Sequence, residues 1–226
     1  MDFATSLPHE LDAEIARAPI AYIPWGAHEW HGVHNPVGVD GIKAEFLAKE
    51  LRAETGGVVL PTVYCGHSTV GTLGFRHSLE FDPETVAAYA RNYLDLLARD
   101  GFRVIVLILG HWGRHHGDTL RRVVAEFNAR QSMARAWAVQ ENEMLHEPGH
   151  PNDHGGPEET SFIMAYVQDR VDLSKLPDRD ITFERDGILG GDPRAGASAE
   201  RGTALARAYA QEAAKRVRAM LEETYA

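Results

Sequence analysis

The sequence predicts a single-domain α/β protein: a three-layer sandwich in which helices cover both faces of a mostly parallel central sheet. Short apolar runs alternate with longer segments whose apolar residues recur at helical spacing. The most hydrophobic run, Phe102–Leu109, is continuous apart from Arg103, as expected of a central strand buried on both faces. The chain has 226 residues, the size of one ordinary domain, and contains no internal repeat or low-complexity linker.

The first half of the chain begins this alternation. We expect a helix over 11–17, a strand over 20–24, a helix over 40–54 and a strand over 58–60. Pro19 ends the first helix, and Gly56-Gly57 ends the second, because glycine readily adopts the left-handed conformation that often follows a helix. Residues 62–82 should form a long loop, and a loop of this length inside a compact domain usually has a function.

The second half continues the pattern. Asp82, Pro83 and Glu84 start a helix with a capping side chain, a proline in the first turn and an acidic group near the positive end of the helix dipole. That helix should end at Gly101. The remaining elements are expected to be strands over 102–109 and 134–140, helices over 118–128, 158–167 and 199–223, a loop over 141–157 and a less regular segment over 171–186.

Three side chains that can bind metal ions follow the first strand: Glu29, His31 and Asp40. Residues two apart in an extended backbone point to the same side, so Glu29 and His31 can face one point. The glycines and the proline between His31 and Asp40 suit a loop that folds back to that point. A mixed carboxylate and imidazole set suits Zn²⁺ or Mn²⁺. The alternative is a solvated polar loop in which Asp40 only caps the following helix.

Similar groups recur at two later positions in the chain. His111 directly follows the strand expected over 102–109, and ligands of open α/β sheets bind outside the carboxyl ends of the strands. His154 and Glu159 lie immediately before and inside the helix expected over 158–167. The sequence therefore predicts a metal site at the carboxyl ends of the strands.

Residues 29–40 have the pattern E-x-H-G-x-H-x-P-x-x-x-D, which resembles the N-terminal motif of the creatininase (creatinine amidohydrolase) family. Gly110-His111 and the segment His154-Gly155-Gly156-Pro157-Glu158-Glu159-Thr160-Ser161 resemble later motifs of that family, in the same order. A Gly-Asp-Pro-Arg segment before the C-terminal helix also matches. The resemblance extends over roughly residues 18–215.

This resemblance implies a site with two divalent metal ions. Asp40 would bridge them, with Glu29 and His111 on one ion and His31 on the other. Gly113 stands where creatininase carries a further carboxylate ligand, and we therefore assign Glu159 to the second ion. The alternative for Glu159 is a charge at the helix start that the helix dipole stabilises. Five ligand groups exceed the three that a single catalytic zinc ion needs.

The ligand set also indicates the chemistry. A metal pair lowers the pKa of a water molecule and polarises a carbonyl group, and histidine commonly delivers the proton that a departing amine needs. By resemblance, His154 is that proton donor. The family places a substrate-side loop at 62–82, where this chain departs from the family pattern. We take Arg76, His77 and Trp112 as candidate substrate-binding residues, with His67 as a further candidate in this loop. Carboxylates without a thiolate favour zinc, with manganese or iron as alternatives.

Charge and composition bear on the partners and the cellular location of the protein. The formal charge of −10 argues against a nucleic-acid partner. A single cysteine, Cys65, excludes an internal disulfide and fits a reducing compartment. No apolar run approaches the length of a membrane span and no secretion signal is recognisable, so we expect a cytoplasmic protein. The resemblance also implies that the protein is a homo-oligomer, because members of the family tend to form hexamers.

The sequence thus predicts a metal-dependent hydrolase of a small C–N bond in a cyclic amide, lactam or formamide. Creatininase carries substrate-gating tryptophans in the loop before its catalytic histidine, and this chain has none between Val139 and His154. We therefore expect a substrate other than creatinine. The alternative is a non-catalytic metal-binding or ligand-sensing protein on the same scaffold, which the altered segment after His111 keeps open.

Overall fold

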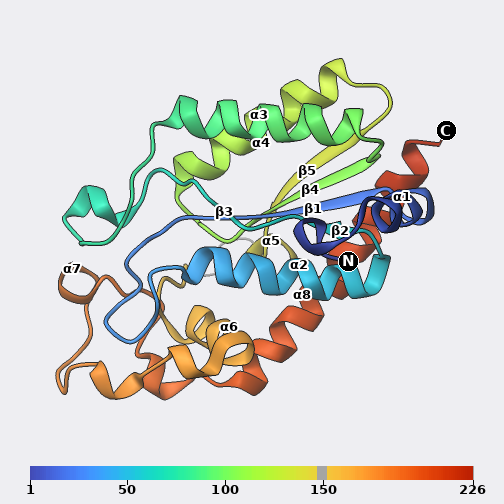
Figure 1. Ribbon diagram of the computed structural model, residues 1–226. Helices are drawn as coiled ribbons and strands as arrows, with labels where there is room; N and C mark the ends of the chain where they lie inside the picture. Colours follow the sequence, from blue (N-terminus) through green and yellow to red (C-terminus); the bar gives the residue numbers. More distant parts are fainter. Residues whose placement is uncertain (147–151, 226) are drawn as a thin grey trace.

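A computed structural model describes residues 1–146 and 152–225 and shows a parallel five-stranded sheet (Figure 1). Its strands are β1 (Ile20–Gly26), β2 (Val58–Val59), β3 (Val63–Tyr64), β4 (Val104–Leu109) and β5 (Arg135–Gln140). They are ordered β2-β1-β4-β5, and β3 pairs with the carboxyl end of β1. The central strands β1 and β4 are buried along their whole length, which explains why both read as continuous apolar runs.

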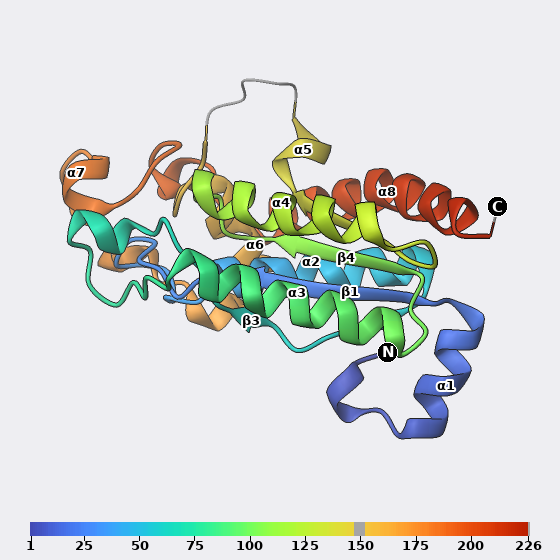
Figure 2. The ribbon, with the colours of Figure 1, turned by 90° about the horizontal axis from the view of Figure 1, so that it is seen from above.

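Helices cover both faces of the sheet, as predicted. On one face lie α3 (Pro83–Arg99) and α4 (Arg114–Arg130); on the other lie α2 (Val39–Thr55), α6 (Pro157–Val167) and α8 (Ala199–Glu223) (Figure 1). Figure 2 shows both termini at the end of the molecule opposite α7 (Phe183–Asp186). The short helices α1 (Pro8–Arg17) and α5 (Asn142–Leu145) complete the set of α-helices in the described part of the chain.

The predicted elements are found, and the differences concern where some of them begin and what the loops contain. Helix α4 begins at Arg114, four residues before the expected start, because the N–H of Gly117 already bonds to the carbonyl of Gly113 and continues the helix through a glycine. The loop expected over 62–82 contains β3 and a 3₁₀ turn at Val70–Leu73, both too short to give a periodic signal. The loop expected over 141–157 contains α5; its residues 147–151 lie outside the described residues.

Strands β1 and β4 run in register from Ile20 opposite Val104 to Trp25 opposite Leu109, so their carboxyl ends lie side by side. Helix α2 begins in contact with both ends. A Cβ atom on Gly110 would lie 1.9 Å from the carbonyl oxygen of Asp40, and one on Gly26 would lie 2.7 Å from its carbonyl carbon. Glycine at both strand ends therefore allows the first turn of α2 to approach the sheet closely.

Among the described residues, none of the helices combines the length and the apolar composition that crossing a bilayer requires.

Candidate metal centre

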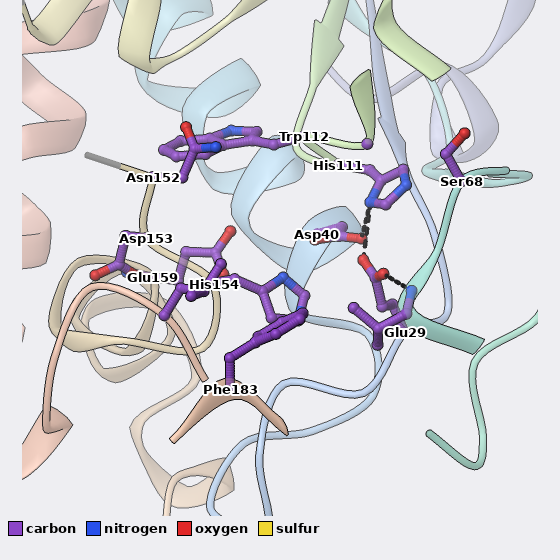
Figure 3. A pocket seen from close by; sticks show the side chains of 13 residues that line it. Glu29, Asp40, Ser68, His111, Trp112, Asn152, Asp153, His154, Glu159 and Phe183 are labelled. Atoms are coloured by element: carbon purple, nitrogen blue, oxygen red, sulfur yellow. Dashed lines mark hydrogen bonds and ion pairs between the residues drawn. The ribbon is translucent and has the colours of Figure 1, made fainter. Parts of the chain in front are cut away.

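Five side chains from four segments meet at the carboxyl ends of β1 and β4. Figure 3 shows Glu29, Asp40, His111 and Glu159 among them. Glu29 and His31 follow β1, Asp40 is in the first turn of α2, His111 follows β4, and Glu159 is in the first turn of α6. Each is at most 2% exposed. The structure thus brings together all five residues that the sequence analysis proposed as metal ligands.

The carboxylate of Asp40 lies between two groups of ligand atoms. Its Oδ2 is 3.2 Å from His111 Nδ1, which is 2.8 Å from Glu29 Oε2. Its Oδ1 is 3.1 Å from His31 Nε2, which is 3.3 Å from Glu159 Oε2. We call Glu29 and His111 the first half of the cluster and His31 and Glu159 the second half. Together with Asp40, each half offers ligand atoms close enough to hold one metal ion.

Main-chain groups orient the first half. His111 Nε2 lies 3.0 Å from the carbonyl oxygen of His67, and Glu29 Oε1 accepts a hydrogen bond of 2.6 Å from the N–H of Val70. A carbonyl oxygen can only accept, so Nε2 of His111 carries the proton and the lone pair of Nδ1 faces the cluster. This arrangement is typical of metal-binding histidines.

The second half is oriented by Lys43 of α2 and by main-chain groups of Glu29 and Gly155. His31 Nδ1 donates to the carbonyl oxygen of Glu29 over 3.0 Å, which leaves the lone pair of Nε2 directed to the cluster. Glu159 Oε1 accepts from Lys43 Nζ at 2.6 Å, and Oε2 accepts from the N–H of Gly155 at 2.8 Å. Gly155 has φ +60, a conformation that glycine adopts without strain.

The electrostatics of the cluster fit a bound cation. Among the described residues, Glu29 Oε2 and His31 Nε2 are buried without a hydrogen bond. Burial by itself lowers the pKa of His31, but the carboxylates of Asp40 and Glu159 outweigh it and raise that pKa to about 9. In the same way, Glu29 and Asp40 raise the pKa of His111 well above its ordinary value against the effect of burial. Three buried carboxylates thus concentrate negative charge around the two imidazoles, which favours a cation at this site.

A cavity of about 140 Å³ opens onto the cluster. Figure 3 shows Trp112 on one side of it and His154 and Phe183 on the other. His154 Nε2 donates to the carbonyl oxygen of Trp30 over 2.8 Å, and its ring stacks on that of His31 with centroids 4.1 Å apart. Burial and the neighbouring His31 lower the pKa of His154, so its ring is neutral at neutral pH.

The predicted substrate contacts divide into two groups. Trp112 lines the cavity, and its indole N–H donates to Glu141 Oε2 over 2.9 Å. Arg76 and His77 have exposed side chains and are absent from the described lining, because the 3₁₀ turn at 70–73 and the left-handed Gly74 carry them outward. Their assignment to substrate binding has no support from the cavity. His67 is buried, and the His111 hydrogen bond uses its main-chain carbonyl.

Two buried charges beside the cluster escaped the sequence analysis: Lys43 and Glu141, 0% and 1% exposed. Lys43 follows Asp40 by one helical turn and precedes the buried Leu47 by another, so it lies on the inward face of α2. The sequence does show Lys43 at helical spacing from a proposed ligand and from an apolar leucine, and this spacing could have indicated that the lysine is buried.

Comparison with known proteins places the chain in a family. The sequence profile described as creatinine amidohydrolase, of the creatininase family, matches residues 6–217. A creatinine amidohydrolase of Pseudomonas putida is 25% identical over 189 residues, which cover 75% of this chain and 73% of that protein.

Solved structures share the fold. A creatininase variant complexed with creatine superposes with a TM-score of 0.80 and 23% identity, covering 96% of this chain and 97% of the other. A manganese form and a zinc–zinc form of creatininase each superpose with a TM-score of 0.75 at 22% identity, with the same coverage. The chain belongs to the creatininase family of metal-dependent amidohydrolases.

Proposed function

We propose that the protein hydrolyses the C–N bond of a small cyclic amide, lactam or formamide with two divalent metal ions bound by the cluster. The observation that carries this proposal is the position of Asp40, whose two oxygens face separate pairs of ligands. A single tetrahedral site would use only three or four of these groups, whereas the two sets of ligand atoms share Asp40 alone.

Glu29, Asp40 and His111 would hold one ion, and His31, Asp40 and Glu159 the other. Such a pair lowers the pKa of a water molecule and polarises the substrate carbonyl. Zinc or manganese suits oxygen and imidazole ligands, and the similar creatininase structures include a manganese form and a zinc–zinc form. Iron is a further alternative, because it also binds imidazole and carboxylate ligands.

His154 would move the proton. Because its Nε2 is bonded to the carbonyl of Trp30, the lone pair of the neutral ring is on Nδ1. That atom can take a proton from the attacking water and deliver it to the nitrogen that leaves. The lowered pKa of His154 suits this order, since a neutral ring must accept a proton before it can donate one.

The cavity favours a small, uncharged substrate. Its volume of about 140 Å³ lies well below the roughly 300–1,000 Å³ of pockets for drug-sized ligands. Its described lining contains no lysine or arginine, so no side chain there would pair with a substrate carboxylate or phosphate. Trp112 and Phe183 offer flat apolar surfaces to a planar ring or amide. Trp112 is the one tryptophan of this described lining, and we propose a substrate other than creatinine.

The test is turnover of the zinc- and manganese-loaded protein on a panel of lactams, cyclic ureides, formamides and creatinine, with metal content measured on the same samples. We expect about two ions per chain and turnover of at least one uncharged amide. Two bound ions without turnover on any member would favour the alternative, a metal-binding or ligand-sensing protein. Fewer than one ion after loading would reject the two-metal site. Light scattering tests the homo-oligomer, with a hexamer expected.

A further inference from the structure

A buried chain of charged groups joins the second half of the cluster to the wall of the cavity. Lys43 Nζ lies 2.6 Å from Glu159 Oε1 and 2.5 Å from Glu141 Oε1. The other oxygen of Glu141 accepts the indole N–H of Trp112, and the Lys43 ammonium lies 4.6 Å from the centre of that ring. The Lys43 and Glu141 side chains are shielded from solvent almost completely.

Packing alone does not account for this pair. Removing two charges from water is costly, and apolar residues of similar volume often stabilise a fold as well or better. Leu47 and Ala44, beside Lys43 on α2, are ordinary apolar core residues, so this face of the helix does accept them. A lysine retained among them indicates a role that an apolar side chain cannot fill.

The contacts of Glu159 show what that role is. Free carboxylates rotate, and each oxygen can face a metal ion. Here Lys43 holds Oε1, while Oε2 faces His31 Nε2 at 3.3 Å. The charge of Glu141 offsets that of Lys43, so the ammonium adds no net positive charge that would repel a cation next to it. Among the described residues, the first half has no corresponding lysine–glutamate pair, since main-chain groups orient it.

We propose that Lys43, held by Glu141, is a positioning residue that fixes Glu159 for the second metal ion and links this ion to Trp112 at the cavity. The proposal rests on the two-metal site proposed above. Lys43 does not line the cavity, and its effect passes through Glu159 and Glu141.

The test is stepwise removal of metal by a chelator from the zinc-loaded, full-length protein. Lys43→Met should weaken binding of the second ion by about 10–100-fold, the range found when a group that supports a ligand is removed. Binding of the first ion should be unchanged. Lys49→Met is the matched control: Lys49 is on the same helix and pairs with Glu45 at the surface, so both ions should remain as tightly bound as in the wild type.

A second variant separates positioning from folding. Lys43→Met leaves Glu141 as an unpaired buried charge, which lowers the melting temperature. Lys43→Met combined with Glu141→Leu removes that charge, so the melting temperature should recover while binding of the second ion stays weak.

Three outcomes contradict the proposal. Two ions held in both variants as tightly as in the wild type would reject the role of Lys43 and leave the two-metal site intact. Recovery of tight binding together with the melting temperature in the double variant would show that Lys43 matters only for folding. A wild type that binds a single ion would reject the two-metal site itself.

Discussion

The two halves of the cluster share Asp40 but are built differently. The first half, Glu29 and His111, is oriented by the main chain at Val70 and His67. The second half depends on Lys43 and on Gly155, which directly precedes α6. These two partners are main-chain groups, whose positions do not depend on a side-chain conformation, whereas Lys43 needs Glu141 to remain in place. We therefore expect the first half to bind its ion more tightly, and the second half to be the part that substitutions can alter separately.

The largest effect should come from the residue that both halves share. Asp40→Ala should remove both ions and with them about 10³-fold or more of turnover, because the metal contribution is several kcal/mol. Metal analysis and kinetics on one sample check this. Asp95→Asn, at a surface ion pair with Arg130, is the control and should behave as wild type. One ion retained after Asp40→Ala would show that the halves are independent sites.

His154 should affect turnover without affecting either half. His154→Asn is expected to lower kcat by about 10²–10⁴-fold, the usual contribution of a general acid–base group, with both ions still bound. The loss should be smaller for substrates with a better leaving group, which need less help from a proton. His154 also lies close enough to Glu29 and His31 to be a ligand, so loss of an ion would reassign it.

Substitution of one ligand in each half tests the comparison directly. Glu159→Gln should deplete the second ion selectively, with at least the roughly 10–100-fold loss of affinity seen for supporting groups, and leave the fold intact. Glu29→Gln should deplete the first ion instead. Metal content after dialysis against a weak chelator distinguishes the two. Full metal content and activity in Glu159→Gln would mean that Glu159 is only a charge at the helix start.

The smallest effect concerns the loop that supports the first half. Glu80 accepts hydrogen bonds from the N–H groups of Ser68 and Thr69, next to the N–H of Val70 that holds Glu29. Burial raises the pKa of Glu80, but a hydrogen bond from the Thr69 hydroxyl and these two main-chain hydrogen bonds outweigh it and place the pKa below its ordinary value of 4.5. The ionised Glu80 carboxylate therefore stabilises the folded state fully above about pH 4.5, and this stabilisation is lost as the pH falls through the lower pKa that Glu80 has in the folded protein.

Glu80→Gln should therefore cost about 0.5–1 kcal/mol of unfolding free energy at pH 7, and less in acid. Chemical denaturation at pH 7 and pH 4 measures both values. An equal cost at the two pH values would show that the carboxylate charge has no part in holding this loop.

The sequence predicted the sheet, its helices and the grouping of Glu29, His31 and His111, because strand ends of a parallel sheet meet at one edge. Asp40 was added because the loop before it can fold back, and Glu159 through the family resemblance. It missed Lys43, since a lysine within a helix normally reads as a surface residue and only packing reveals that this one is buried. Arg76 and His77 were placed at the substrate because a long loop with glycines suggests function, but loop direction depends on turns such as Gly74 that spacing does not reveal. Their role in binding stays a prediction.

Glu159 and the lysine that holds it lie far apart in the sequence, and this separation affects how the protein folds. Glu159 meets Lys43 across a separation of 116 residues, so the second half can close only after the sheet and α6 have docked. We expect contacts that form this late to be absent from the transition state for folding. We expect bound ions to slow unfolding and to leave the folding rate almost unchanged. The bound ions would then lengthen the lifetime of the native state without changing how fast that state forms.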